Sequence, residues 1–342
     1  MPRAQKPSAK GLSDTVVPYV ATSPSSNGRS RTPTKGLRKM KEATWASYAK
    51  YAKAYETVVV EGKDIRLEGH RRVKTFGPGQ DEEQQSTVWS FPDRGNWATH
   101  KASYRGNWSP WVPRNLILKY SEPGDTVLDQ MVGGGTTLVE CKLLGRRAIG
   151  VDINRDSLML AMDRLNFDLP TPMDDLLSEP LPEIKLFQGD ARRLDAIPSD
   201  SIDLIATHPP YANIIPYSKA APIEGDLSQV HTLNDFFDGM AAVAAESLRV
   251  LKPGGYAGIL IGDTHKYAHY VPMAYRTLGA FLQAGFILKE DVIKLQHNVQ
   301  TARTRWRPWF LRNFLDTMHE HLFIFRKLRP DEDERKFSAS RL

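Results

Sequence analysis

Residues 127–137 read VLDQMVGGGTT, the pattern of an apolar strand that ends in an acid, a glycine-rich turn and the start of a helix. Glycine tolerates positive φ angles and lets the backbone approach a ligand closely. The helix that follows offers free N–H groups at its N-terminus, which suit carboxylate or ribose oxygens. A glycine turn also joins strands to helices without binding anything, so its meaning depends on context. The residues that would bind a ligand here are Asp129, Gly133, Gly135, Thr136 and Thr137.

Strand and helix patterns alternate around this turn. Apolar strand patterns occur at residues 126–129, 147–152, 184–188, 202–207, 257–261, 286–294 and 320–326. Apolar residues recur at helical spacing at 136–144, 154–165 and 236–251. Strands that alternate with helices predict an α/β fold with a doubly wound, mainly parallel sheet.

Two further acids follow predicted strands. Asp152 ends a strand about twenty residues after the glycines, where an acid is placed to hydrogen-bond a ribose diol. Asp190 follows the next strand and could hold an adenine amino group, or could be an ordinary acid in a surface turn. The Gly-x-Gly-x-x-Gly spacing of the dinucleotide fold is missing, which argues against a nicotinamide enzyme.

A proline-containing loop, IATHPPY at residues 205–211, comes directly after a strand, where open α/β sheets bind ligands. The two prolines extend the backbone before them and direct the carbonyls of His208 and Pro209 outward. An extruded nucleic-acid base needs such acceptors for its amine and an aromatic ring to stack on, which Tyr211 supplies. The alternative is a stiff loop with an aromatic plug. The candidate catalytic residues are His208, Pro209, Pro210 and Tyr211.

Together these segments resemble the DNA amino-methyltransferases, which methylate adenine N6 or cytosine N4. The family's glycine motif typically reads DPFxGxGTT, and Gln130 and Met131 replace its proline and aromatic residue here. The family's catalytic loop begins with Asp, Asn or Ser before Pro-Pro, whereas this loop begins with His208. The sequence RVLKPGG at residues 249–255 resembles the helix-to-strand turn of the same fold, and the whole resemblance covers about residues 97–327.

The resemblance implies a Rossmann-like class I methyltransferase with a seven-stranded, mainly parallel sheet and a reversed C-terminal β-hairpin. It implies S-adenosylmethionine as the cofactor, with Asn107 and Arg114 in the remaining cofactor motif beside the glycine turn. It also implies methylation of double-stranded DNA, and we expect adenine N6 as the target, with cytosine N4 as the alternative. An RNA or release-factor glutamine methyltransferase and a non-catalytic DNA-binding protein are further alternatives. The chemistry requires no metal.

Composition adds weaker constraints on the 342-residue chain. Lys and Arg total 46 against 40 Asp and Glu, a net charge of +6 that favours a polyanionic partner. The single cysteine, Cys141, excludes an intrachain disulfide and a cysteine-based zinc site. We expect a basic disordered tail over 1–40, an N-terminal extension over 41–99 for DNA recognition or dimerisation, a catalytic domain over 100–330 and a C-terminal tail over 331–342.

Two aromatic segments have open roles. Trp45, Tyr48, Tyr51 and Tyr55 follow helical spacing, and we interpret them as a core-facing stripe rather than a DNA-contacting surface. Between residues 298 and 313, arginines alternate with aromatic residues, which suits DNA phosphates and stacking or an ordinary packed loop. Its candidate DNA-binding residues are Arg303, Arg305, Trp306 and Arg307. The expected partner is DNA. A homodimer and a restriction endonuclease partner are left open, with a stand-alone methylase as the alternative to the latter, and we expect no membrane contact and a cytoplasmic, nucleoid location.

Overall fold

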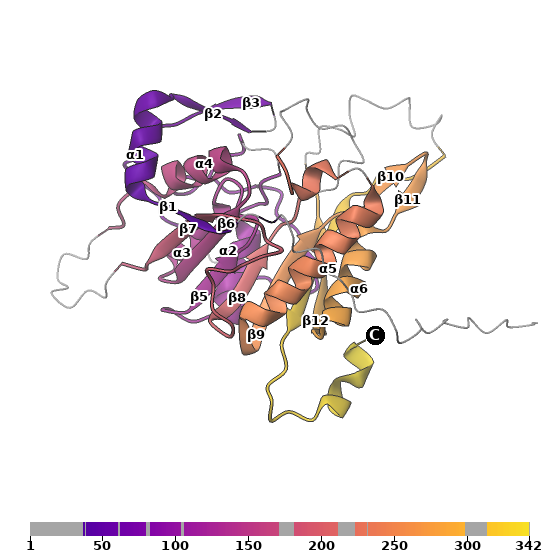
Figure 1. Cartoon of the computed structure of the whole chain (residues 1–342). Helices are drawn as coiled ribbons and strands as arrows, with labels where there is room; N and C mark the ends of the chain where they lie inside the picture. Colours follow the sequence, from indigo (N-terminus) through magenta and orange to yellow (C-terminus); the bar gives the residue numbers. More distant parts are fainter. Residues whose placement is uncertain are drawn as a thin grey trace, which may run out of the picture. The chain divides into compact units, whose positions relative to one another are not determined.

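The computed structural model describes residues 37, 39–60, 62–79, 83–103, 106–170, 181–210, 223–230, 232–297 and 313–341. Residues 34–342 form one compact unit (Figure 1), and the boundaries expected at residues 99 and 330 stay predictions. The predicted tail over 1–40 lies outside the described residues, apart from Leu37, Lys39 and Met40.

A single large sheet organises this unit. Among the described residues it has nine strands, in the order β1-β7-β6-β5-β8-β9-β13-β12-β4. The central strands β7, β6, β5, β8 and β9 are all parallel, and β13 is antiparallel to both β9 and β12. The strands are β1 Lys41–Ala43, β4 Val88–Trp89, β5 Thr126–Asp129, β6 Arg147–Asp152, β7 Ile184–Gln188, β8 Ile202–Thr207, β9 Leu251–Ile261, β12 Ile287–Leu295 and β13 His319–Arg326.

The order confirms the predicted α/β methyltransferase architecture with its reversed C-terminal hairpin. The predicted number of seven strands is corrected to nine in the described part of the chain, because two short N-terminal strands extend the sheet at its edges. β1 pairs antiparallel with β7, and β4 pairs parallel with β12. An unpaired edge strand leaves backbone N–H and C=O groups free, and these short segments satisfy them.

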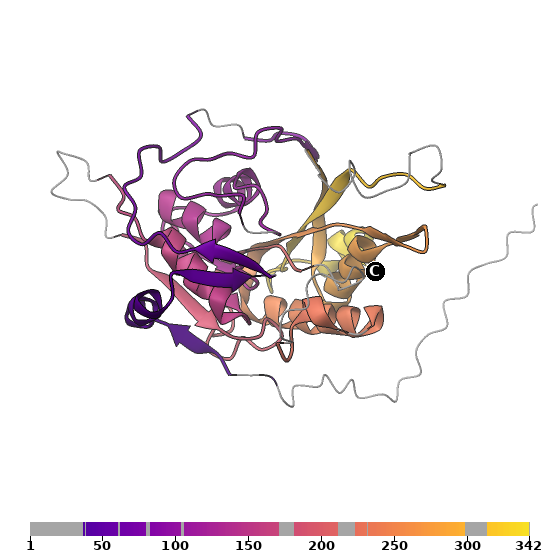
Figure 2. The same ribbon diagram turned by 90° about the horizontal axis from the view of Figure 1, so that it is seen from above.

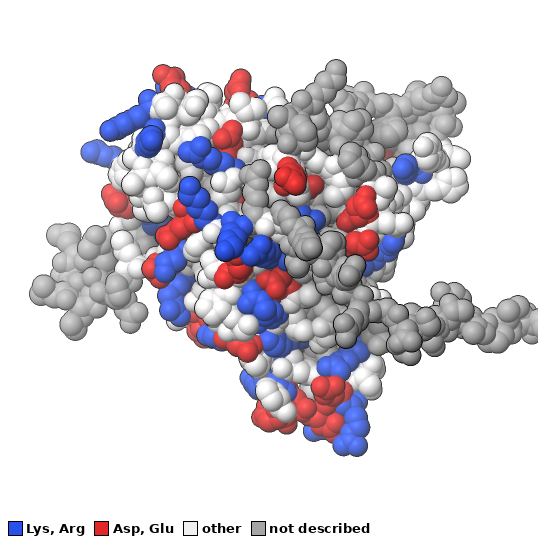
Figure 3. Space-filling view, viewed as in Figure 1, with Lys and Arg blue, Asp and Glu red and all other residues white. Residues whose placement is uncertain are grey.

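Helices cover both faces of the sheet (Figure 2). One face carries α2 Trp111–Tyr120, α3 Thr136–Leu143 and α4 Arg155–Leu165, and the other carries α5 Leu233–Val250 and α6 Met273–Ala284. Each face has its own apolar core, since alternate strand residues point to opposite sides. No helix within the described residues is long and apolar enough to cross a membrane. Figure 3 shows acidic and basic side chains interspersed over the described part of one face.

The N-terminal extension packs on α4 through helix α1 Trp45–Ala54 and the hairpin β2 Thr57–Val60 and β3 Lys63–Arg66. The core-facing interpretation of the aromatic stripe is confirmed for Tyr48 and Tyr51, which are 5% and 8% exposed. It is wrong for Trp45 and Tyr55, which are 50% and 58% exposed because they lie at the two ends of the helix.

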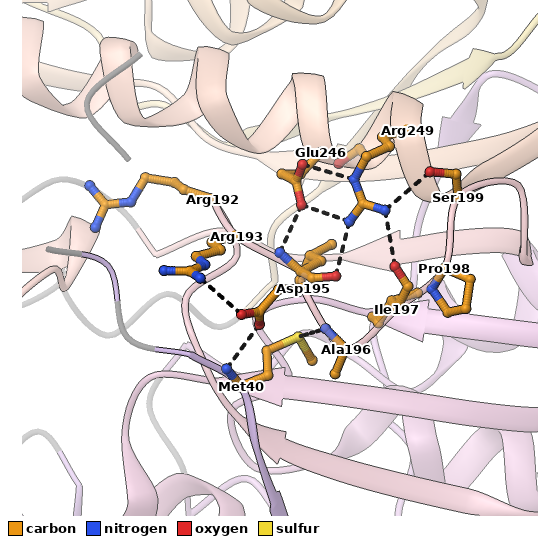
Figure 4. Close-up of polar contacts among 12 residues, drawn as sticks. Met40, Arg192, Arg193, Asp195, Ala196, Ile197, Pro198, Ser199, Glu246 and Arg249 are labelled. Carbon is orange, nitrogen blue, oxygen red and sulfur yellow. Dashed lines mark hydrogen bonds and ion pairs between the residues drawn. The ribbon is translucent and has the colours of Figure 1, made fainter. Parts of the chain in front are cut away.

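The loop after β7 is held on α5 by Arg249. Its guanidinium donates to the carbonyls of Leu194 and Ile197 at 2.9 and 3.0 Å. Asp195 of the same loop accepts a 3.0 Å hydrogen bond from the backbone of Met40, the residue before β1 (Figure 4). The N-terminal edge of the sheet is thereby tied to the loop that follows β7.

Candidate active site

The carboxylate of Asp129 joins the glycine turn to the proline-containing loop. Its Oδ2 accepts from the hydroxyl of Thr137 at 2.5 Å, and its Oδ1 accepts from the hydroxyl of Thr207 at 2.8 Å. Burial raises the pKa of Asp129 to about 6, although these hydrogen bonds lower it. Thr137 lies in the first turn of α3 and Thr207 ends β8, so one buried carboxylate links the two predicted motifs.

The glycine turn has the predicted backbone geometry, with φ of 49° at Gly133 and 82° at Gly135. A Cβ at Gly135 would lie 2.9 Å from the Cβ of Ala161, so the turn is packed tightly against α4. Arg164 of the same helix donates to the carbonyl of Gly134 at 2.9 Å. Thr136, the first residue of α3, is buried beside this turn.

Asp152 lies at the carboxyl end of β6, as predicted, and faces the same turn. Its Oδ2 accepts from the backbone N–H of Gly133 at 2.8 Å, and its Oδ1 accepts from that of Asn154 at 2.8 Å. Burial raises the pKa of Asp152 to about 7, and the charge of Asp226 adds to the rise. Additional O–H donors would stabilise the ionised form, and a ribose diol supplies two.

Asp190 is bound by an arginine that the sequence did not single out. Both of its oxygens accept from Arg192, at 2.9 and 2.6 Å. Arg192 also donates to the carbonyl of Gly225 at 2.7 Å, and in Figure 4 its side chain points away from the Arg249 contacts. The segment after the catalytic loop therefore returns to Asp190, whose expected contact with an adenine amino group stays a prediction.

The two residues of the remaining cofactor motif lie in different surroundings. Asn107 lies beside the glycine turn, because its Oδ1 is 3.2 Å from the position of a Cβ on Gly134. Arg94 donates to the carbonyls of Asn107 and Trp108 at 3.0 and 2.7 Å and fixes this segment. The cofactor role of Asn107 stays a prediction.

Arg114 belongs to a buried polar cluster between α2 and α3. Its guanidinium donates to Glu140 Oε2 at 3.1 Å. Glu140 Oε1 accepts from the indole of Trp97 at 2.7 Å and lies 2.6 Å from the ring of His100. This arrangement gives Arg114 a structural partner that its motif did not indicate, and its expected cofactor role is untested.

The first residue of the catalytic loop, His208, is enclosed by side chains. Its ring stacks on Trp108 with a centroid distance of 5.9 Å and an interplanar angle of 21°. Its Nε2 lies 3.9 Å from Glu320 Oε1, and Glu320 Oε2 accepts from Lys294 at 2.8 Å. Burial lowers the pKa of His208, and the nearby Glu320 offsets part of this decrease. The lowered pKa keeps the imidazole neutral near pH 7, so that it can accept a hydrogen bond.

The remaining predicted residues are only partly described. Pro209 is buried and Pro210 is half-buried after β8. Tyr211, Arg303, Arg305, Trp306 and Arg307 lie outside the described residues, so their roles stay predictions. Within the described ranges, no group of three or more His, Cys, Asp or Glu residues is arranged to hold a metal ion.

The family to which this chain is similar agrees with this arrangement of residues. The family described as DNA methylase matches residues 17–163 and 202–339. Those residues include the glycine turn, Asp152 and the catalytic loop, and they make up most of the chain. The chain belongs to this DNA methylase family. The predicted resemblance to the DNA amino-methyltransferases is thus confirmed, together with S-adenosylmethionine as the cofactor of this family.

Individual relatives match shorter parts of the methylase. The type II methyltransferase M.SmaI of Serratia marcescens is 32% identical over 88 residues, 26% of this chain and 29% of that protein. The type II methyltransferase M.HpaI of Haemophilus parainfluenzae is 47% identical over 51 residues, 15% of this chain and 16% of that protein. A release factor glutamine methyltransferase of Caulobacter vibrioides is 32% identical over 165 residues. The chain therefore spans half or less of the length of these curated relatives.

Solved structures include two similar proteins. A putative DNA modification methylase of Thermus thermophilus, complexed with S-adenosyl-L-methionine, is 24% identical with a TM-score of 0.31, covering 42% of this chain and 56% of that chain. A SAM-dependent methyltransferase of Methanosarcina mazei is 16% identical with a TM-score of 0.40, covering 62% of this chain and 96% of that chain.

The residues around the turn fit the methylase's cofactor. A ligand backed by Gly133 and Gly135 meets no side chain at those two positions, and the carboxyl of Asp152 lies next to them. The sequence did not indicate the residues that secure the site from outside these motifs. These are Arg94, Arg164, Arg192, Gly225, Lys294 and Glu320. Only Glu320 carried a signal, as the acid that begins the strand predicted over 320–326.

Proposed function

We propose that this DNA methylase transfers a methyl group from S-adenosylmethionine to the exocyclic amine of a base rotated out of double-stranded DNA, with adenine N6 as the target. The observation that supports this proposal is the pair of hydrogen bonds that Asp129 accepts. Its carboxylate binds Thr137 of the glycine turn and Thr207 directly before His208. A donor held at the turn and an amine held at the loop would therefore meet at the same edge of the sheet.

The cofactor, when bound, supplies an electrophilic methyl group. Asp152 would accept from the ribose hydroxyls, since its carboxylate faces the glycine turn and lies half-buried at the end of β6. Asp190 and Asn107 would hold the adenine and methionine ends. The turn itself contributes its backbone and the N-terminus of α3, and Arg164 keeps the carbonyl of Gly134 in place.

The catalytic loop would act on the amine by accepting its hydrogen bonds. The amine lone pair is conjugated with the base ring, and acceptors on its N–H bonds favour a more tetrahedral, nucleophilic nitrogen. The Pro209 carbonyl and the neutral ring of His208 are the proposed acceptors, and Tyr211 would stack on the base. The methyl carbon would exchange its bond to the sulfonium sulfur for a bond to the amine nitrogen, which leaves the sulfur as a neutral thioether. The proton lost by the amine would pass to the neutral ring of His208, and Glu320, 3.9 Å away, would stabilise the resulting imidazolium.

Plasmid methylation tests this function directly. The protein is incubated with plasmid DNA and labelled S-adenosylmethionine, and the DNA is digested to nucleosides. The proposal expects N6-methyladenine at a defined sequence, and N4-methylcytosine would support the alternative target. His208→Ala should lose methylation while keeping cofactor binding, and Asp152→Ala should weaken cofactor binding. Full turnover by His208→Ala would contradict the role given to this residue.

A protein substrate is the second candidate. The observation in its favour is the match to a release factor glutamine methyltransferase, which covers 45% of this chain and 50% of that protein. Label in a release factor, with none in DNA, would favour this candidate. A protein that binds S-adenosylmethionine without methylating DNA, RNA or protein would favour a non-catalytic role.

The wider setting of this enzyme is also proposed rather than observed. Double-stranded DNA is the proposed partner, contacted in part by the segment that holds Arg303, Arg305, Trp306 and Arg307. A homodimer, a companion restriction endonuclease and a cytoplasmic, nucleoid-associated location stay predictions. Sedimentation of the full chain with and without DNA tests the dimer.

A further inference from the structure

A short hairpin leaves the sheet beside the catalytic loop. Strands β10 Thr264–Lys266 and β11 His269–Val271 pair antiparallel, directly after β9 ends at Ile261. β9 is the parallel neighbour of β8, so its carboxyl end lies at the same edge as His208. Figures 1 and 2 both show the hairpin projecting beyond the sheet.

The tip of this hairpin has an unusual sequence for its backbone. Tyr267 and Ala268 form the two-residue turn, and their φ angles are 53° and 61°. Positive φ at both positions is characteristic of type I′ turns, which favour Asn-Gly because a Cβ is disfavoured there. Outlying backbone conformations of this kind cluster at functional sites. The turn also leaves the ring of Tyr267 87% exposed at the tip.

The base of the hairpin is held by several contacts. The hydroxyl of Tyr270 donates to Asp263 Oδ2, and Asp263 Oδ1 accepts from the backbone of Ala274 at 2.7 Å. The ring of His265 lies 4.9 Å from that of Phe314 and 5.6 Å from that of Tyr270. The exposed tip is therefore carried by a fixed base rather than by a loose loop.

The hairpin itself carries one charged side chain, Lys266, and the acid at its base, Asp263, is bound by Tyr270. Between Asp263 and Glu290 the sequence holds Lys266, Arg276 and Lys289 but no acid. The next acid-free segment runs from residue 292 to residue 315 and includes the arginine-rich stretch, and its Phe314 contacts the hairpin. Lys266 lies 5.6 Å from the ring centroid of Tyr267, and Figure 3 shows only basic and uncharged atoms at the projecting end.

We propose that the β10–β11 hairpin is a DNA-contacting finger, in which Tyr267 stacks on a base beside the target site and Lys266 binds a backbone phosphate. An exposed aromatic ring next to a lysine provides the stacking surface and the charge that nucleic acid requires. A basic tip suits this polyanion better than an apolar protein surface. The inference rests on the proposed function, since it assumes that DNA is the substrate.

Binding of a fluorescein-labelled, mixed-sequence DNA duplex tests the finger. Tyr267→Ala should raise the Kd for DNA roughly tenfold because the stacking contact is lost. Tyr267→Phe, which keeps the ring, is the matched control. The double variant Tyr267→Asn with Ala268→Gly favours the turn but lacks the ring, so it separates loss of stacking from loss of the hairpin. Lys266→Ala should lower the slope of log Kd against log salt concentration by about 0.9, the contribution of one phosphate contact.

The outcomes distinguish this proposal from the function on which it rests. If wild type binds and methylates DNA while all tip variants bind like wild type, only the finger is overturned. If wild type neither binds nor methylates DNA, both proposals fall. A tip variant that changes the sedimentation of the protein without changing its DNA affinity would make the hairpin a contact between copies and also overturns the finger. Cofactor affinity should be unchanged in every variant.

Discussion

The carboxyl of Asp152 makes cofactor affinity depend on pH. Burial raises its pKa to about 7, well above the usual value of 3.8. Ribose hydroxyls donate to the ionised carboxylate, so affinity should be present above this pKa and lost as the pH falls through it. With a pKa of 7, the ionised fraction is about 9% at pH 6 and about 91% at pH 8. The Kd of wild type should therefore fall about tenfold between these two pH values.

Isothermal titration calorimetry with S-adenosylmethionine measures this change, and Asp152→Asn is the matched control. The asparagine keeps the size of the side chain but does not titrate. The α-amino group of the ligand and the carboxyl of Asp129 titrate in the same range in both proteins, so the ratio of the two Kd values isolates Asp152. An equal pH dependence in wild type and Asp152→Asn would refute the ribose role.

Four other substitutions separate stability from function. Gly135→Ala should lower the free energy of unfolding by about 2 kcal/mol in urea, because its φ is 82° and a Cβ would lie 2.9 Å from a neighbouring Cβ. Gly134→Ala would displace the buried guanidinium of Arg164 from the Gly134 carbonyl, so cofactor affinity should fall; unchanged affinity would contradict a role of this turn in cofactor binding. Glu140→Ala leaves a buried guanidinium without its carboxylate and should cost about 3–5 kcal/mol in urea unfolding, whereas a loss below about 1 kcal/mol would show that the cluster is unimportant. Glu320→Gln removes the charge that raises the pKa of His208, so the acid limb of the pH–rate profile should move to lower pH. An unmoved limb would show that Glu320 does not affect the titration of His208 during turnover.

The central strands could be predicted because their signals are local. The predicted bounds of β5, β6, β7 and β8 agree with the structure, since short apolar runs end there in an acid, a glycine or a turn. Asp129 and Asp152 were placed by the same rule, which puts functional side chains at the carboxyl ends of parallel strands. Helix α2 was not predicted, because Pro113 argues against a helix in sequence. Proline is tolerated here because it lies in the first turn of the helix.

Contacts between distant segments could not be predicted in the same way. Glu140 looks like an exposed helical acid in sequence, yet it is fully buried and binds Arg114, Trp97 and His100. Strand β1 has no apolar alternation, and it is a strand because it pairs with the edge of β7. Such features depend on which partner the fold brings close, and periodicity carries no information about that.

The histidine at the start of the proposed catalytic loop has such a distant partner. Where the family has Asp, Asn or Ser, this chain has His208, and a carboxylate from β13 lies 3.9 Å from its ring. An aspartate at position 208 would set two carboxylates against each other in a buried site, which raises the pKa of one of them. A neutral histidine avoids that repulsion and still accepts a hydrogen bond, while Lys294 balances the charge of Glu320. In the proposed function, the acidic group beside the loop is therefore supplied by a different strand, β13.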